Sequence, residues 1–124
     1  KKGILHGIAT SNSRELVTNV ISVLGLTDYF SCIMTSCEAK KGKPAPDLFL
    51  LAAKTKGFEE KNCIVIGDSL NDFAGAKSAN MKCIAFVGAE GNDTKEYRQK
   101  CIDAGVVAVC ATMNDVKKYL DNIA

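Results

Sequence analysis

An acidic pair is the part of the sequence best suited to bind a metal ion. Asp68 and Asp72 lie four residues apart, directly after the apolar residues 63–66, with Gly67 before the first aspartate and Asn71 before the second. Mg²⁺ prefers carboxylate oxygens and water, and few protein ligands hold it when a phosphate supplies the rest. The alternative is structural: Asp68 caps the following helix and Asp72 interacts with the helix dipole.

A second group of polar residues follows another apolar segment. Thr10, Ser11 and Asn12 come directly after an apolar run that ends at Ala9. Backbone N–H groups at the start of a helix, together with a hydroxyl, form a phosphate-binding site. The alternative is ordinary helix capping by Asn12 or Ser13.

One lysine stands in a conformationally restricted segment. Lys43 is followed by Pro44 and Pro46, which limit the backbone and lead into a helix with Asp47 in its first turn. A lysine held in this way would neutralise a bound anion as a compact point charge. The alternative is a solvated side chain.

Composition narrows the class of protein. The 124 residues suit one compact domain, and a net charge of +2 without a basic stripe gives no support for nucleic acid. No apolar run approaches the roughly 20 residues that span a bilayer. Six cysteines without a C-x-x-C pair, beside a single His, do not predict zinc. A disulfide framework is possible on count alone, but free thiols in a cytoplasmic protein are favoured.

The three polar groups fall between alternating strand and helix patterns. Strands are predicted at about 4–9, 32–35, 63–66, 83–87 and 106–109. Helices are predicted between the cap at Asn12 or Ser13 and a stop at Gly25, and at about 48–56, 69–79, 93–104 and 115–123. Such alternation predicts an α/β fold with a parallel sheet and helices on both faces. Ligands bind at the carboxyl ends of strands in such sheets, so the three groups should meet there.

The polar residues at 10–12, which we call the hydroxyl turn, are followed along the chain by Lys43 and then by the acidic pair. This order resembles that of the motifs in the haloacid dehalogenase-like superfamily. Thr10 matches the hydroxyl residue of the family's second motif, and residues 43–47 match the K-P-x-P-D form of its third. Gly67, Asp68 and Asp72 match the G-D-x-x-x-D of its fourth motif. The K-P-x-P-D form is common in the phosphoglycolate phosphatase-like and β-phosphoglucomutase-like branch, and the resemblance implies that branch's Rossmann-like fold.

The resemblance also implies an activity. It is that of a Mg²⁺-dependent phosphohydrolase, which acts on a small phosphorylated metabolite through an aspartyl-phosphate intermediate. The implied catalytic residues are Thr10, Lys43 and Asp68, and phosphate would contact Thr10, Ser11, Asn12 and Lys43. Asp68 would bind Mg²⁺, Asp72 would support the metal shell, and Gly67 and Asn71 would support the motif.

The chain departs from the family in its first motif. That motif, D-x-D-x-[TV], provides the aspartyl nucleophile, and no two aspartates in residues 1–124 are separated by one residue. The substrate-selecting cap domain is also not recognised. We therefore expect a partial core of motifs two to four, inactive alone, without the central strand between those that end at Thr10 and Gly67. An N-terminal segment or a second chain would complete the sheet, or the two flanking strands would pair directly.

Two other functions stay open. A phosphoglucomutase-like phosphotransferase is closely related, but its members often have Glu at the position of Gly67. A non-catalytic anion-binding or regulatory remnant would explain the absent first motif without any enzymatic step. The residues encoded upstream in the gene would separate these possibilities.

Overall fold

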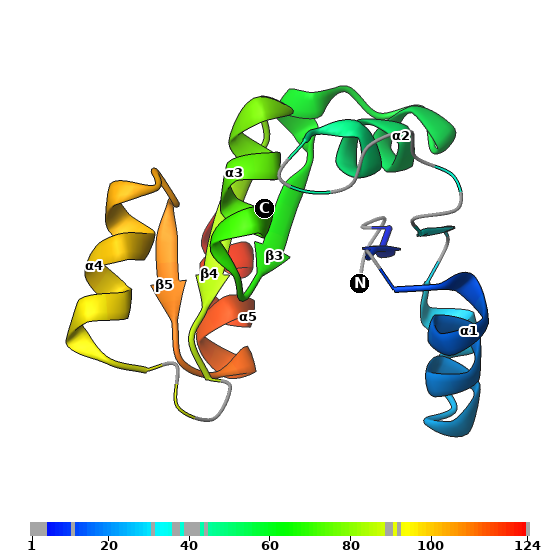
Figure 1. The fold of residues 1–124 in the computed structure, drawn as a ribbon, viewed down its shortest axis with the longest axis horizontal. Coiled ribbons are helices and arrows are strands. Elements are labelled where there is room, and N and C mark those ends of the chain that lie inside the picture. Colours follow the sequence, from blue (N-terminus) through cyan, green and yellow to red (C-terminus); the bar gives the residue numbers. More distant parts are fainter. Residues whose placement is uncertain are drawn as a thin grey trace.

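The computed structural model describes residues 5–10, 12–30, 32–35, 38, 43, 45–88, 91 and 93–123 (Figure 1). Strands and helices alternate along the chain, as predicted. The strands are β1 (Gly7–Ala9), β2 (Cys32–Met34), β3 (Ile64–Gly67), β4 (Lys82–Phe86) and β5 (Ala108–Cys110). The helices are α1 (Arg14–Val23), α2 (Asp47–Thr55), α3 (Leu70–Ser78), α4 (Lys95–Asp103) and α5 (Met113–Ile123), with short 3₁₀ turns at Thr27–Tyr29 and Glu60–Asn62.

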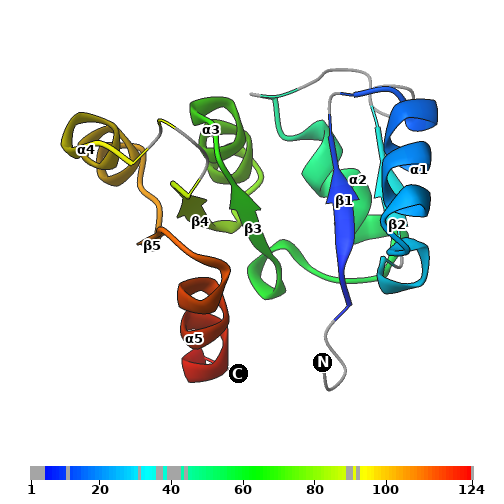
Figure 2. The same cartoon turned by 90° about the horizontal axis from the view of Figure 1, so that it is seen from below.

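All strand pairings are parallel, but they form two sheets instead of one. β1 pairs with β2, and β3, β4 and β5 pair in that order. β1 and β3 are the neighbouring strands of the two sheets (Figure 2). The α/β class is confirmed, whereas direct pairing of β1 with β3, one of the alternatives expected from the sequence, is wrong. The Lys43 ammonium instead bridges the Ala9 carbonyl at the end of β1 and the Asp72 carboxylate in α3.

Helix boundaries follow local signals in the sequence. Ser13 caps α1 by accepting a hydrogen bond from the Leu16 N–H at 3.3 Å, so Ser13 takes the capping role for which Asn12 was the other candidate. Thr94 caps α4 in the same way. Asn80, at φ 60°, follows α3 in the left-handed conformation that ends helices.

Helices cover both faces of the three-stranded sheet. α3 and α4 lie on one side of it and α5 on the other (Figure 2). The larger core cluster, on the α3 side, includes Phe49, Phe73 and Cys83, and a smaller one beneath α5 contains Ile84 and Val116. β3 is less buried than its apolar sequence predicts, since Ile66 is 44% exposed. β3 pairs on one side only within the described residues, which accounts for this exposure.

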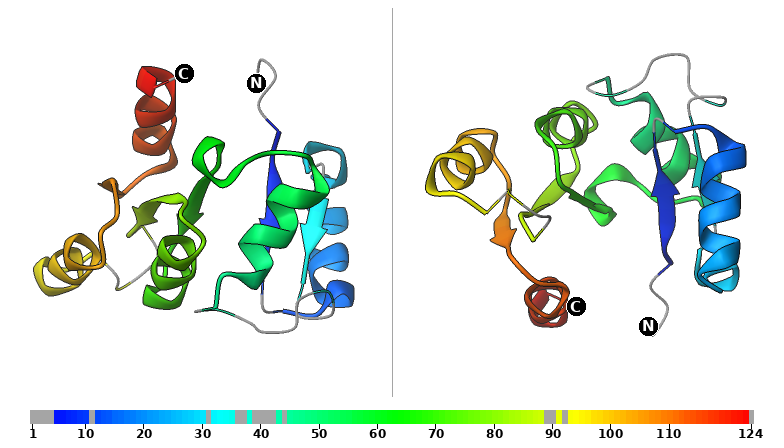
Figure 3. Two further views of the ribbon diagram at one scale, coloured as in Figure 1. Left: turned by 90° about the horizontal axis from the view of Figure 1, so that it is seen from above. Right: turned by 60° about the horizontal axis from the view of Figure 1, so that its bottom comes forward.

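α2 joins the two sheets. It contacts β1 and β2 (Figure 3) and also packs against α3. A Cβ at Gly75 of α3 would lie 2.9 Å from the Phe49 ring of α2, so this close approach depends on glycine. The packing brings Lys43, just before α2, next to Asp72 in α3.

Two further observations complete the fold. The described cysteines are Cys32, Cys63, Cys83, Cys101 and Cys110, and all are free thiols. Across the described part of the chain, every helix is too short or too polar to traverse a bilayer.

Candidate functional site

A crevice of about 220 Å³ lies at the carboxyl ends of β1 and β3. The polar residues that line it are Thr10, Asn12, Lys43, Asp68, Ser69, Asn71 and Asp72. The three polar groups of the sequence therefore meet in one place, as expected from a parallel sheet. Ser11, the remaining predicted phosphate contact, lies outside the described residues.

Lys43 and Asp72 form the central ion pair of this crevice. The Lys43 Nζ lies 2.5 Å from Asp72 Oδ1, and the two side chains are only 14% and 11% exposed. Nζ also donates a hydrogen bond of 3.2 Å to the Ala9 carbonyl at the end of β1. The lysine is thus a bridge between the two sheets, and the alternative of a fully solvated side chain is wrong.

Both carboxylate oxygens of Asp72 have partners within the protein. Oδ2 accepts the backbone N–H groups of Asp68 and Ser69 at 3.2 and 3.3 Å, while the Asp72 N–H donates to Ser69 Oγ. This reciprocal arrangement is a capping box, so Ser69, and not Asp68, caps α3. Asp72 is therefore placed to support the site by fixing the turn and Lys43.

Electrostatics favour the ionised form of Asp72. Burial is the largest influence and acts to raise its pKa. The hydrogen bond and positive charge of Lys43, together with hydrogen bonds from Ser69 and Asp68, outweigh burial and hold the pKa below its usual value. The carboxylate thus stays charged beside the ammonium group.

Gly67 supports this arrangement by its small size. A Cβ at position 67 would lie 2.5 Å from the Cβ of Asp72. Any larger residue here would displace the aspartate. The close approach of Asp72 therefore explains why the motif has glycine at position 67.

Asp68 has a different environment from Asp72. It is exposed, and its carboxylate makes no hydrogen bond with the residues that the structure describes. Its backbone is held on both sides of the residue: the N–H donates to Asp72 Oδ2, and the carbonyl accepts the Tyr97 hydroxyl at 2.6 Å. Asp68 is consequently the carboxylate available to a cation in this crevice.

The hydroxyl turn presents a second polar group. Thr10 Oγ1 accepts the Asn12 N–H at 3.1 Å, and the Thr10 N–H donates to the Met34 carbonyl, which extends the β1–β2 pairing. The Thr10 hydroxyl accepts this bond, so its own proton can be donated to an anion.

A polar network outside the motifs joins the end of β2 to α1. Arg14, the first residue of α1, pairs with Glu38 at 2.9 Å and donates to the Ile33 carbonyl. Glu38 Oε1 also accepts the backbone N–H and the hydroxyl of Thr35, each at 2.7 Å. Hydrogen bonds from Arg14 and then Thr35 lower the pKa of Glu38 to about 2. The network ties the end of β2 to the helix that follows Thr10.

Sequence comparison identifies the family. The haloacid dehalogenase-like hydrolase family matches residues 1–86 of the chain. This chain is a member of that family. The matched span contains all three polar groups of the crevice and ends with β4, whereas α4, β5 and α5 lie beyond it.

Individual relatives of this haloacid dehalogenase-like chain include phosphatases. It is 32% identical over 92 residues to a phosphoglycolate phosphatase of Neisseria meningitidis, covering 74% of this chain and 39% of that protein. It is 39% identical over 84 residues to a bifunctional riboflavin kinase/FMN phosphatase of Arabidopsis thaliana, covering 67% of this chain and 22% of that protein. The aligned segments thus cover well under half the length of these two relatives.

Solved structures agree with the fold. The β-phosphoglucomutase of Clostridium difficile superposes with a TM-score of 0.78 and 26% identity, over 98% of this chain and 49% of that one. The Rossmann-like α/β class expected from the sequence is confirmed by this likeness.

The donor set of the crevice suits a hard cation in one specific way. Among the described residues, no group of three or more His, Cys, Asp and Glu side chains gathers to hold a metal ion. Mg²⁺ does not need such a group, because it commonly binds one or two carboxylates together with waters and substrate phosphates. The exposed Asp68 carboxylate fits that mode.

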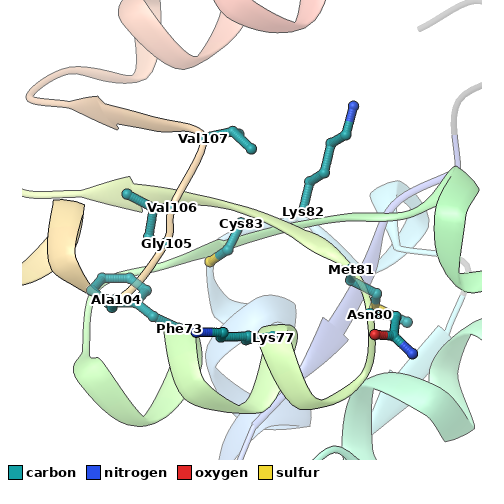
Figure 4. Close-up of a pocket in the computed structure, with 10 residues that line it drawn as sticks. All are labelled: Phe73, Lys77, Asn80, Met81, Lys82, Cys83, Ala104, Gly105, Val106 and Val107. Carbon is teal, nitrogen blue, oxygen red and sulfur yellow. The ribbon is translucent and has the colours of Figure 1, made fainter.

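A second cavity of about 280 Å³ lies at the opposite edge of the three-stranded sheet (Figure 4). Its walls come from α3, the start of β4 and the segment before β5, including Phe73, Cys83 and Val107. Lys77 and Lys82 are its charged residues, and no carboxylate lines it. The acidic and hydroxyl residues of the crevice lie at the carboxyl ends of β1 and β3, and none of them lines this cavity. The cavity is therefore separate from the haloacid dehalogenase-like site.

Two features of the site are absent from the sequence motifs. Tyr97 lies on α4, 29 residues after Asp68 in the turn that follows β3, and no spacing rule joins them. The Arg14–Glu38 pair likewise links segments 24 residues apart. Each depends on tertiary packing, so neither could be found by pattern alone.

Proposed function

We propose that this chain is the core of a Mg²⁺-dependent phosphohydrolase that acts on a small phosphorylated metabolite through an aspartyl-phosphate intermediate. The observation that carries the proposal is the crevice in which an exposed Asp68 carboxylate faces the same space as Thr10 and the buried Lys43–Asp72 pair. A cation site beside a fixed ammonium and a hydroxyl is the arrangement that a phosphate group requires.

Each residue would have a distinct part in this function. Lys43 would neutralise charge on the phosphate, and the Thr10 hydroxyl and Asn12 would orient it, with Ser11 as a further expected contact. Asp68 would hold Mg²⁺, and Asp72 would support the site by fixing Lys43 and the Asp68 backbone. The Mg²⁺ ion would offset the negative charge of the phosphoryl group and its leaving oxygen.

The nucleophile would come from outside these 124 residues, since they hold no D-x-D pair. We place it on a strand between β1 and β3, supplied by a preceding segment of the same protein or by a second chain. Such a strand would pair with both neighbouring edges and bring its aspartates to the crevice. The 124-residue chain, as motifs two to four of the core without a cap, would then be inactive alone.

The test compares this chain with one extended by the upstream residues of its gene. Hydrolysis of p-nitrophenyl phosphate is measured with and without Mg²⁺. The extended protein should be active with Mg²⁺ and should lose activity in Asp68→Asn and Lys43→Ala. Lys117→Ala, which removes a lysine of an exposed ion pair on α5, should have no effect. Equal turnover by the 124-residue chain, abolished by Asp68→Ala, would contradict the proposal.

A phosphoglucomutase-like phosphotransferase is the second candidate, because the chain resembles the Clostridium difficile β-phosphoglucomutase. The crowding at Gly67 argues against it: a Glu at this position would require Asp72 to move. Product analysis separates the two activities, since transfer to a sugar hydroxyl leaves no free phosphate. A regulatory remnant would bind phosphate in the extended protein without turnover.

A further inference from the structure

We infer that Tyr97 is a positioning residue for Asp68, whose backbone it fixes from a helix outside the span that the family matches. The inference rests on the proposed function, in which the Asp68 carboxylate binds Mg²⁺. Tyr97 does not line the crevice and would not touch the substrate, so its effect would pass through Asp68.

The geometry places Asp68 between two helices. The Tyr97 hydroxyl of α4 donates to the Asp68 carbonyl at 2.6 Å, and Asp72 Oδ2 of α3 accepts the Asp68 N–H at 3.2 Å. The Asp68 side chain has no hydrogen bond of its own to the described residues. The point from which its carboxylate extends is therefore set by the backbone, which these two contacts hold.

Tyr97 is itself well anchored. Its N–H donates to Thr94 Oγ1 at 3.1 Å in the cap of α4, and its ring packs against the larger core cluster. Because both the backbone and the ring of Tyr97 are held in place, its hydroxyl has little freedom to move. The short hydrogen bond to Asp68 is consequently a fixed contact between α4 and the turn after β3.

This contact has a consequence for cation binding. Groups that orient a ligand without touching the metal raise its affinity, because the ligand does not have to be ordered when the cation arrives. Losing one such hydrogen bond should weaken Mg²⁺ binding about threefold to tenfold. The Asp72 contact would remain, so binding should be weakened and not abolished.

The experiment is a titration of the ¹⁵N-labelled protein with MgCl₂, followed through the backbone amide signals of Asp68 and Ser69. Tyr97→Phe removes the hydroxyl and keeps the ring in the core. Tyr119→Phe is the matched control: Tyr119 packs against the smaller core cluster on α5, and its hydroxyl has no hydrogen-bond partner among the described residues. Asp68→Asn tests the cation site itself, and thermal unfolding of each variant is measured in parallel.

The expected result is a Kd for Mg²⁺ about threefold to tenfold higher in Tyr97→Phe, unchanged in Tyr119→Phe, and no saturable binding in Asp68→Asn. If Asp68→Asn abolishes binding while Tyr97→Phe binds like the wild type, the inference is overturned and the proposed function stands. The inference also fails if Tyr97→Phe lowers only the melting temperature, since that is a purely structural role. Undiminished binding by Asp68→Asn would overturn both.

Discussion

The Lys43 Nζ lies 2.5 Å from Asp72 Oδ1, and the two residues come from the segment before α2 and from α3. Lys43 also holds the Ala9 carbonyl at the end of β1, while Asp72 holds the backbone of the turn after β3. One ion pair thus connects the end of β1 with the turn after β3 and holds the charged groups of the crevice together. Stability and function should therefore respond to it together.

Removing the ammonium group should destabilise the protein. Lys43→Met leaves the largely buried Asp72 carboxylate without its counter-charge, and we expect a loss of about 1–3 kcal/mol in the free energy of unfolding. Urea denaturation measures it. Lys117→Met, which breaks an exposed pair, should cost no more than about 0.5 kcal/mol. Equal losses in the two variants would show that the Lys43–Asp72 pair is no stronger than a surface contact.

Asp72 should make stability depend on pH in the acid range. Its pKa is lowered in the folded state, so its contribution is fully present above its unfolded pKa of about 3.9 and is lost as pH falls through the folded value. Wild type and Asp72→Asn should therefore differ most in unfolding free energy near neutral pH and converge as the solution is acidified. Urea denaturation between pH 7 and pH 3 measures this difference. A constant difference across the range would contradict the assignment.

Gly67→Ala should disturb the acidic motif. The new Cβ would lie 2.5 Å from the Asp72 Cβ, and relieving that overlap should cost about 1–3 kcal/mol of unfolding free energy. The steric origin can be checked in an Asp72→Gly background, where the clashing atom is absent. There the same substitution should cost clearly less. An equal cost in both backgrounds would place the strain elsewhere.

The Arg14–Glu38 pair should influence anion binding from outside the crevice. Glu38→Ala frees the end of β2 from α1, and the Met34 carbonyl at that end accepts the Thr10 N–H of the crevice. We expect affinity for inorganic phosphate, measured by calorimetry, to fall about twofold to tenfold. Glu59→Ala, at an exposed pair with Lys61, should leave it unchanged. Matching affinities for the two variants would confine the network to a structural role.

Much of the fold follows from local sequence. Apolar runs and the cap at Ser13 place the strands and helices within a few residues, because such signals act on neighbouring backbone groups only. The gathering of the Thr10, Lys43 and Asp68 segments follows from one topological rule, that parallel strands end at a common edge. These predictions needed no knowledge of distant contacts.

What escaped prediction depends on which segments meet in space. Periodicity does not say whether β1 and β3 pair, and the direct pairing that was one expected alternative is not formed. The family resemblance assigned Asp68 to the metal and Asp72 to a supporting part, but the residues alone did not show what makes the two aspartates different. The difference arises from their surroundings: Asp72 lies beneath Lys43 and the turn, while Asp68 projects into solvent.

The one-sided pairing of β3 also bears on how the protein behaves in solution. An edge strand with an exposed residue such as Ile66 offers its unpaired N–H and C=O groups to any extended segment nearby. A strand seated between the two sheets would occupy the edges of β1 and β3 together, so that neither edge would be left for a further molecule. Self-association of the chain would thus indicate that the sheet is incomplete, and self-association should stop when such a strand is supplied.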